Sequence, residues 1–259
     1  MAAVRLLIVL AAVYLAVCVL LYLIQDRLIF HPRPLVSNPR APHLEELVLQ
    51  HDGVRLHGWL VNGDAPGPLI VYFGGNAEEV SHLTSVFRRL PARTALVNYR
   101  GFGASGGEPS VEHLVADARR LIRHLVERRG ADRPLILFGR SLGTGIAVAA
   151  ADVAEVDGMI LLSPYVSLER LARRVVPFVP VGWLLRHRLD ASAHLDALPE
   201  RVLVFHAVDD PVIPARESRA FVALLDPPPL TVTFEADHDV PLDHPALWPH
   251  VVRFVDDSN

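Results

Sequence analysis

Apolar residues along the chain form one long run followed by many short ones. From Leu6 to Ile24 every residue is apolar or Tyr, with Arg5 before the run and Gln25-Asp26-Arg27 after it. A helix of this length just spans the hydrocarbon core of a bilayer, which is about 30 Å thick. The pattern therefore predicts a single transmembrane anchor within residues 1–27, followed by a Pro-rich linker at residues 28–45.

The alternative for this run is a cleaved signal peptide. The apolar region of a signal peptide usually measures about 7–15 residues, and it ends at a small-x-small cleavage site. This run is longer and no such site closes it, so a retained anchor and a single-pass membrane location are favoured. Arg27, Arg33 and Arg40 follow the run and Arg5 precedes it, a small excess that leans toward a cytoplasmic C-terminal domain without assigning the side.

The shorter apolar runs predict a domain of the α/β class over residues 46–259. Residues 46–49 and 54–61, joined through Asp52-Gly53, have the pattern of a β-hairpin. Helical patterns at 110–129 and 216–225 lie between later apolar runs, which favours a mostly parallel central sheet with helices on both faces. The buried strands are expected at 69–73, 94–99, 135–138, 159–162, 202–205 and 230–234.

Composition narrows the possible partners and compartments. With 259 residues, of which 51% are hydrophobic, the chain can bury one large core. The formal net charge of -4 gives no basic footprint for nucleic acid, although every cationic residue among the 25 Lys and Arg is Arg. Cys18 is the only cysteine, so the chain forms no intrachain disulfide and has no cysteine set for a zinc site.

A serine stands at the junction of an apolar run and a helix of small residues, in the stretch "LILFGRSLGTGIAVAA". Gly139 and Gly143 flank Ser141 at the spacing of a nucleophile elbow, a turn too tight for neighbouring side chains, which presents the serine hydroxyl. The alternative is that Ser141 only caps the helix, but capping does not require glycine on both sides. We therefore expect Ser141 to be an exposed nucleophile.

Other chemistry-bearing residues also follow predicted strands. Gly74-Gly75-Asn76 comes after the strand at 69–73, Asp209-Asp210 after the strand at 202–205, and His238 after the strand at 230–234. The carboxyl ends of parallel strands meet at one edge of a sheet, where active sites collect. Serine, acid and histidine thus occur in the chain order that is typical of nucleophile-elbow enzymes.

These motifs resemble the α/β-hydrolase fold, and within it the membrane-anchored ABHD-type serine hydrolases. The quoted stretches are "VYFGGNA", "NYRGFGASGG", "FGRSLGTG", "HAVDDPVIP" and "ADHDVP", in the order found in that family. The resemblance implies that Ser141 is the nucleophile, His238 the base and Asp210 the acid. It also implies an oxyanion hole made by the backbone N–H groups of Asn76 and Leu142. Such a site requires no metal and no cofactor.

Two of these assignments have rivals in the sequence. Asp209 adjoins Asp210, and geometry decides between them; Asp210 is preferred because it precedes "PVIP" as the family's acid does. His244 and His250 follow His238 but are less closely tied to the end of a strand.

A glycine motif, "GFGASG" at 101–106, matches the G-x-G-x-x-G pattern of dinucleotide sites and offers an oxidoreductase as an alternative. A dinucleotide motif opens directly into a helix, whereas here Gly107-Glu108-Pro109 intervenes and Ser110 has the features of the helix start. The glycines are therefore expected to shape a loop beside the active site.

Residues 165–200 lie where this fold often carries a lid. The central stretch "VVPFVPVGWLL" is apolar, and arginines flank it on both sides. One interpretation is a cap that rests on anionic lipid and guides acyl chains to Ser141, with Phe178 and Trp183 contacting the chain. The other is an ordinary helical pair that covers the sheet.

Taken together, the patterns favour a membrane-tethered serine hydrolase that cleaves an ester or thioester of a lipid or another acylated substrate. The same three side chains also suit a peptidase or amidase. A third possibility is a membrane-tethered binding protein that keeps the fold without catalysis, but such a protein usually lacks one of the three catalytic side chains. Membrane lipid is the expected partner, and the sequence does not determine the oligomeric state.

Overall fold

The computed structural model describes residues 1–128 and 133–258. Its centre is an eight-stranded sheet with the strand order β1-β2-β4-β3-β5-β6-β7-β8. β1 pairs antiparallel with β2 and β2 antiparallel with β4, whereas the remaining neighbours are parallel. The mostly parallel α/β sheet is therefore confirmed. The strands are β1 Leu44–His51, β2 Val54–Val61, β3 Leu69–Phe73, β4 Arg93–Val97, β5 Leu135–Arg140, β6 Gly158–Leu162, β7 Val202–Ala207 and β8 Leu230–Phe234.

The predicted strands lie where they were expected, and the largest differences are at strand ends. β5 continues two residues past the apolar run at 135–138, because Gly139 pairs with Leu161 and Arg140 with Leu162 of β6. The added pairing carries the backbone of β5 to the residue before Ser141.

Helices cover both faces of the sheet. Consecutive side chains of a strand point to opposite faces, so Val71 and Phe73 belong to one hydrophobic cluster and Ile70 and Tyr72 to the other. The first cluster lies against α3, α4 and α7, and the second against η1, α2 and α8. These elements are η1 Val80–Leu83, α2 Thr84–Phe87, α3 Val111–Val126, α4 Leu142–Ala150, α7 Ala215–Val222 and α8 Trp248–Asp256.

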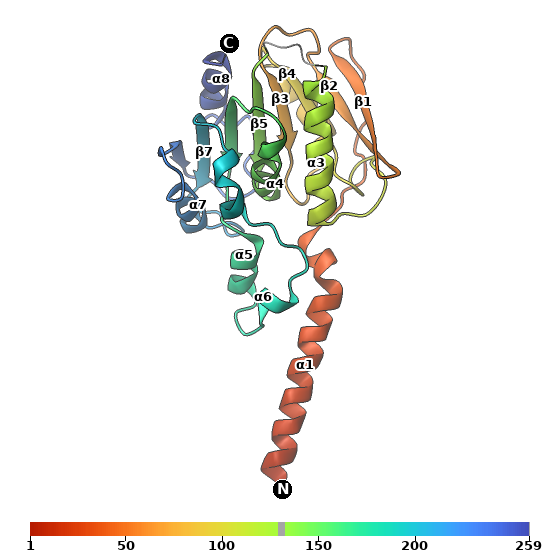
Figure 1. The fold of residues 1–259 in the computed structure, drawn as a ribbon, viewed down its shortest axis with the longest axis vertical. Coiled ribbons are helices and arrows are strands. Elements are labelled where there is room, and N and C mark those ends of the chain that lie inside the picture. The colour runs from red at the N-terminus through yellow and green to blue at the C-terminus, as the bar shows by residue number, and fades with distance from the viewer. Residues whose placement is uncertain (129–132, 259) are drawn as a thin grey trace.

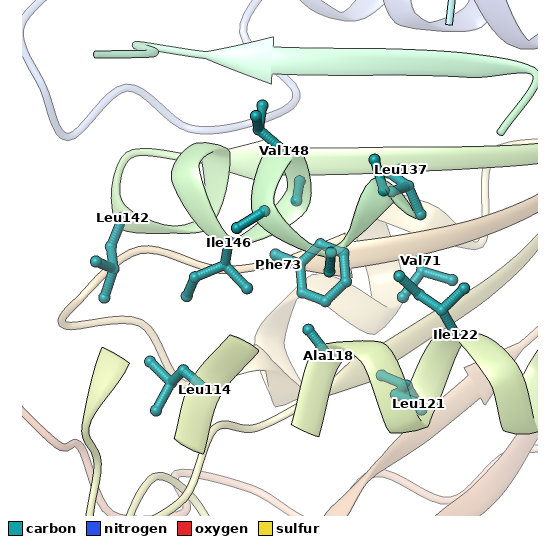
Figure 2. Packing of buried hydrophobic residues seen from close by; sticks show 14 of the residues in the cluster. Val71, Phe73, Leu114, Ala118, Leu121, Ile122, Leu137, Leu142, Ile146 and Val148 are labelled. Atoms are coloured by element: carbon teal, nitrogen blue, oxygen red, sulfur yellow. The ribbon is translucent and has the colours of Figure 1, made fainter. Parts of the chain in front are cut away.

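The first of these cores is drawn in Figure 2, where side chains of α3 and α4 meet those of β3 and β5. The apolar residues of α3 recur on one helical face, at Leu114, Ala118, Leu121 and Ile122. The Ser110 hydroxyl caps α3 by accepting a hydrogen bond from the backbone N–H of His113 at 3.1 Å. The expected helix start is thus confirmed. The helix ends at Val126, while position 129 lies outside the described residues.

The helix α1, Ala2–Ile29, projects away from the sheet domain (Figure 1). It is long and apolar enough to cross a membrane by length and composition, and most of its residues are exposed. The helix continues two residues past Arg27, and β1 begins at Leu44 within the predicted linker. The linker is held in place by a bridge between Pro34 and Gly103.

Residues 165–200 form three short helices, which are α5 Leu168–Val175, α6 Val181–Leu184 and η3 Ala191–Ala197. α5 and α6 lie beside the upper half of α1, on the side of the domain from which α1 projects (Figure 1). The Tyr14 hydroxyl donates a hydrogen bond to the backbone oxygen of Phe178 at 3.0 Å. Two segments that are far apart in the sequence, α1 and the segment between α5 and α6, are therefore in contact.

Candidate active site

Ser141 occupies a strained turn between β5 and α4. Its backbone has φ 52 and ψ -119, a conformation that side chains rarely adopt. A Cβ atom at Gly143 would lie 2.0 Å from the backbone oxygen of Phe73, and one at Gly139 would lie 2.5 Å from that of Gly143. Glycine is thus required at both flanking positions because the backbones of β3, β5 and α4 pack directly against each other.

The turn brings the Ser141 hydroxyl to His238. Ser141 stands at the first position before α4, but its side chain does not cap that helix. Its Oγ lies 2.9 Å from His238 Nε2, and His238 Nδ1 lies 2.7 Å from Asp210 Oδ2. The three side chains come from the loops that follow β5, β7 and β8, so the structure places them together at the carboxyl edge of the sheet.

The Asp210 carboxylate is buried and saturated with donors. Its Oδ1 accepts hydrogen bonds from the backbone N–H groups of Val212, at 2.9 Å, and Ile213, at 2.7 Å. Its Oδ2 accepts one from the Ser163 hydroxyl at 3.0 Å and faces His238. Burial raises the pKa of Asp210, but the hydrogen bonds and the charge of His238 outweigh it and hold the pKa below the ordinary value. The carboxylate therefore stays ionised at neutral pH.

The rival residues lie elsewhere. Asp209 is exposed, and its backbone N–H donates to the oxygen of Ala236 at 3.1 Å. The ring of His244 packs on Phe234, and that of His250 packs edge-on to Phe205. His238 and Asp210, and not their neighbours, are the residues that the structure brings to Ser141.

Asn76 and Leu142, the two residues expected to form an oxyanion hole, line the same cavity as Ser141. Leu142 is the first residue of α4, where backbone N–H groups have no partner within the helix and the helix dipole is positive. Neither N–H finds an acceptor among the residues that the structure describes. The Asn76 side chain donates to the backbone oxygen of Ile29 at 2.9 Å and so ties this loop to α1.

Two charged residues that sequence reasoning missed hold these loops together. Glu78 Oε2 accepts hydrogen bonds from the backbone N–H of Gly75, at 2.9 Å, and from the Tyr72 hydroxyl, at 2.7 Å. Glu78 Oε1 accepts one from Arg140 at 3.0 Å, and Arg140 also donates to the backbone oxygen of His238 at 3.2 Å. Glu78 and Arg140 thus connect the Asn76 loop, the Ser141 turn and the His238 loop.

The sequence contained a weak signal for this pair. Both residues are charged and directly follow stretches of small or apolar residues, namely "FGGNA" before Glu78 and "LFG" before Arg140. Charged residues are rarely buried unless they are paired, and both side chains are largely buried here. What the sequence did not show is that these two charges meet each other.

Two cavities meet at Ser141, and they differ in character. One, of about 350 Å³, lies between α1, α5 and α6 and is mainly apolar, with Arg174 the only charged residue among the described residues that line it. The other, of about 520 Å³, lies on the side of His238 and is lined by Arg33, Glu78, Glu79, His82, Arg140 and Asp239 together with smaller residues. Phe178 and Trp183 line neither cavity and are 87% and 89% exposed, so the structure does not support the interpretation that these two rings contact an acyl chain. Val176 and Val179, in the turn between α5 and α6, line the apolar cavity instead.

Comparison with known proteins identifies the family. Residues 65–189 match a family model described as serine aminopeptidase, S33. The uncharacterized protein YfhR of Salmonella typhimurium is 30% identical over 222 residues, which cover 77% of this chain and 75% of YfhR. Human protein ABHD12B is 31% identical over 176 residues, covering 57% of this chain and 47% of that protein. The chain belongs to the ABHD-type α/β hydrolases.

The fold of this hydrolase is shared with solved esterases. The Pyrococcus furiosus esterase Pf2001 superposes with a TM-score of 0.71 at 16% identity, covering 89% of this chain and 98% of that one. The family resemblance and the fold expected from it are thus confirmed.

The glycine-rich stretch at 101–106 follows β4 and forms a closed loop, with a hydrogen bond from Gly101 N to Gly106 O at 3.0 Å. Gly103 bridges to Pro34, which lines the polar cavity. The loop therefore lies behind one wall of the site.

Proposed function

We propose that this hydrolase is a membrane-anchored serine esterase or thioesterase that acts on a lipid or another acylated substrate. The observation that carries the proposal is the hydrogen-bonded series Ser141–His238–Asp210. Ser141 Oγ lies 2.9 Å from His238 Nε2, and His238 Nδ1 lies 2.7 Å from Asp210 Oδ2. These distances permit proton transfer from serine to histidine without rearrangement.

In the first half of the reaction, Ser141 Oγ attacks the carbonyl carbon of the ester or thioester while His238 Nε2 takes its proton. Asp210 accepts the hydrogen bond from His238 Nδ1–H, which fixes the tautomer and stabilises the imidazolium. The oxyanion accepts hydrogen bonds from the N–H groups of Asn76 and Leu142, each of which contributes about 3–4 kcal/mol to transition-state stabilisation.

To complete acylation, the tetrahedral intermediate collapses and the bond to the alcohol or thiol breaks. The leaving group takes the proton from His238 Nε2, and the acyl group remains on Ser141. A water molecule then gives a proton to His238 and attacks the acyl carbonyl, which releases the carboxylic acid and returns the proton to Ser141. Both halves use the same oxyanion donors.

The acyl specificity is supported by the apolar cavity that ends at Ser141. Each CH₂ group of a chain buried there gains up to about 0.8 kcal/mol, so long acyl groups are the preferred substrates.

A retained anchor is supported by Leu21 and Tyr22, which line the same cavity. Cleavage of a signal peptide near Gln25 would remove both side chains and open the cavity to solvent.

A peptidase or amidase is the second candidate, because the matching family model is described as a serine aminopeptidase. An aminopeptidase requires a group that recognises the substrate's free amine, and a carboxylate is suited to this role. Among the described residues, the apolar cavity has no carboxylate in its lining. The ester is therefore preferred, and Glu79 and Asp239 in the polar cavity are the groups that the peptidase alternative would use.

A fluorophosphonate probe tests the proposal, since it reacts with activated serines. The full-length wild type should be labelled and should hydrolyse acyl esters, whereas Ser141→Ala should do neither. Ser110→Ala, which removes the cap of α3, is a matched serine control and should still be labelled. Labelling that persists in Ser141→Ala would show another nucleophile, and cleavage of aminoacyl amides in preference to esters would establish the peptidase instead.

Washing membranes with alkaline carbonate tests the anchor separately. A spanning helix stays in the bilayer, whereas a surface-bound protein is released. Recovery of the chain in the wash, or a mature amino terminus near Gln25, would contradict a retained anchor.

A further inference from the structure

One face of α1 is covered although the helix as a whole is exposed. Cys18 and Gln25 are buried, and Tyr14 is hydrogen-bonded to Phe178 of the segment between α5 and α6. Positions three, four, seven and eight residues apart lie on the same side of a helix. The residues of α1 that line the apolar cavity follow this spacing, namely Leu21, Tyr22, Gln25, Leu28 and Ile29.

A polar clamp holds the end of α1 against residues 184–187. Gln25 Oε1 accepts a hydrogen bond from the backbone N–H of Arg186 at 2.8 Å. The Asp26 carboxylate accepts two hydrogen bonds from the Arg186 guanidinium, at 2.8 and 2.9 Å, and also pairs with His187. The ring of Phe30 packs edge-on to that of His187, with 5.0 Å between the ring centres. α1 is therefore fixed in position and rotation relative to this segment.

The apolar cavity lies between α1 and the α5–α6 segment, which the polar clamp holds together. Leu171 and Val175 of α5 and Leu184 of α6 face it from the side opposite α1, and Ser141 borders it. The hydrogen bond from Asn76 to the backbone oxygen of Ile29 brings the end of α1 to the oxyanion loop itself. A volume of about 350 Å³ is within the range of small-molecule sites.

We propose that α1 is a wall of the acyl-binding site as well as an anchor. The fatty acyl chain of the substrate lies between the C-terminal half of α1 and α5–α6, with its carbonyl group at Ser141. The chain enters from the lipid leaflet in which α1 and α5–α6 lie. This inference rests on the proposed function, because it requires an acyl ester or thioester to be cleaved at Ser141.

The arrangement lets a lipid chain reach the serine without crossing water. The exposed side chains of Phe178 and Trp183 lie on the segment that flanks α1, so the outer surface of this segment is apolar as well. A chain that moves from the bilayer into a groove between two apolar walls keeps its CH₂ groups out of water throughout. A soluble domain with an anchor that served only as a tether would not need this contact.

Tryptophan substitutions in α1 test the proposal by filling the groove at two depths. Leu21 and Leu28 are about two helical turns apart, or about 10 Å along the axis, and Leu28 is nearer the loop that contains Asn76. The full-length protein in a fixed detergent is assayed with a series of esters from acetyl to palmitoyl. Leu21→Trp should lower the ratio of kcat/KM for palmitoyl over butyryl esters by about tenfold, since each lost CH₂ contact costs up to about fourfold. In Leu28→Trp the fall should begin at a shorter chain length.

Leu23→Trp is the matched control, because Leu23 belongs to the same helix, is exposed and does not line the cavity. It should keep the wild-type ratio. Each variant is first labelled with a short-chain fluorophosphonate to show that the site is intact, and Leu21→Phe replaces Leu21→Trp if that variant is not labelled. Unchanged ratios in both groove variants, or equal falls in Leu21→Trp and Leu23→Trp, would overturn the role of α1 while leaving ester hydrolysis in place. A wild type without Ser141-dependent ester cleavage would overturn the proposed function itself.

Discussion

The two cavities that meet at Ser141 are built from different kinds of structure. The polar cavity is formed by loops at the carboxyl edge of the sheet, and two of its charged side chains, Arg140 and Glu78, are paired with each other. The apolar cavity is formed by helices outside the sheet, namely α1, α5 and α6. Under the proposed function, the chemistry takes place at the sheet edge, and the helices around it select the acyl group.

This difference predicts that the two cavities respond differently to mutation. Changes at the sheet edge should lower the rate for every acyl chain, because they alter groups that act in the transition state. Changes in the apolar cavity should alter the preference among chains, because they alter contacts that lie away from the reacting bond.

The largest effect is expected at Asp210, which is linked through His238 to Ser141, the residue at which the two cavities meet. Asp210→Asn should lower kcat about 10⁴-fold at every chain length, because an amide in place of the acid leaves the histidine in the wrong tautomer. Asp209→Asn is the matched control and should have little effect, because Asp209 is exposed. Steady-state kinetics on a short and a long ester provide the measurement. A large loss in Asp209→Asn alone would transfer the acid role to that residue.

A smaller loss is expected on the polar side. Glu78→Gln removes the charge that pairs with Arg140 and weakens the contact to the backbone N–H of Gly75. Because hydrogen bonds to charged groups contribute about 1.5–3 kcal/mol, kcat should fall about 10- to 100-fold. Glu45→Gln, at an exposed position of β1, is the control. The ratio between long and short esters should stay constant in Glu78→Gln; a changed ratio would mean that this side also selects the acyl chain.

The Asp210 carboxylate should also change the stability of the fold in acid, by a moderate amount. The folded pKa of Asp210 is lowered relative to the unfolded value of about 3.9. Its ionised form therefore stabilises the fold fully above that value, and this stabilisation is lost as the pH falls through the folded pKa. Urea unfolding between pH 6 and pH 2.5 should show this loss in the wild type and less of it in Asp210→Asn. Identical pH profiles would mean that the carboxylate contributes no net stability.

The smallest effect is expected for the exposed aromatic residues beside the apolar cavity. Phe178→Ala combined with Trp183→Ala should change the ratio between long and short esters by less than about twofold, and stability by about 0.5 kcal/mol or less, as is usual for exposed positions. The same ester series measures the first and thermal unfolding the second. A tenfold loss on palmitoyl esters would place these rings in the path of the acyl chain after all.

The sheet could be predicted because local patterns encode it. The runs at 69–73 and 230–234 coincide with β3 and β8, because short stretches of apolar and β-branched residues favour strands. The burial expected for 230–234 is wrong, since β8 lies at the edge of the sheet and only Phe234 is buried. The helix start at Ser110 was also readable, because a capping serine acts on the next three residues. Residues 165–200 were less predictable: the same amphipathic pattern fits a lid and an ordinary helical pair, and which side chains face inward depends on what lies opposite.

The site could be predicted in part for the same reason. Gly139 and Gly143 mark Ser141 in the sequence. A Cβ atom at Gly139 would clash with the adjoining turn, whereas one at Gly143 would clash with Phe73 of β3, a contact that only the fold reveals. The pairing of Glu78 with Arg140 was not readable, because 62 positions separate the two residues. No local pattern records which charges meet across such a distance.

By itself, the sequence determined the strands and helices of this protein, including the long apolar helix, because each depends on neighbours within a few residues. It also marked the turn at Ser141 through the glycines on either side. The tertiary structure alone decided that Asp210 rather than Asp209 faces His238, and that one face of α1 lines a cavity. Both outcomes depend on how segments far apart in the chain pack together, and packing follows the shape and polarity of surfaces that exist only once the chain has folded.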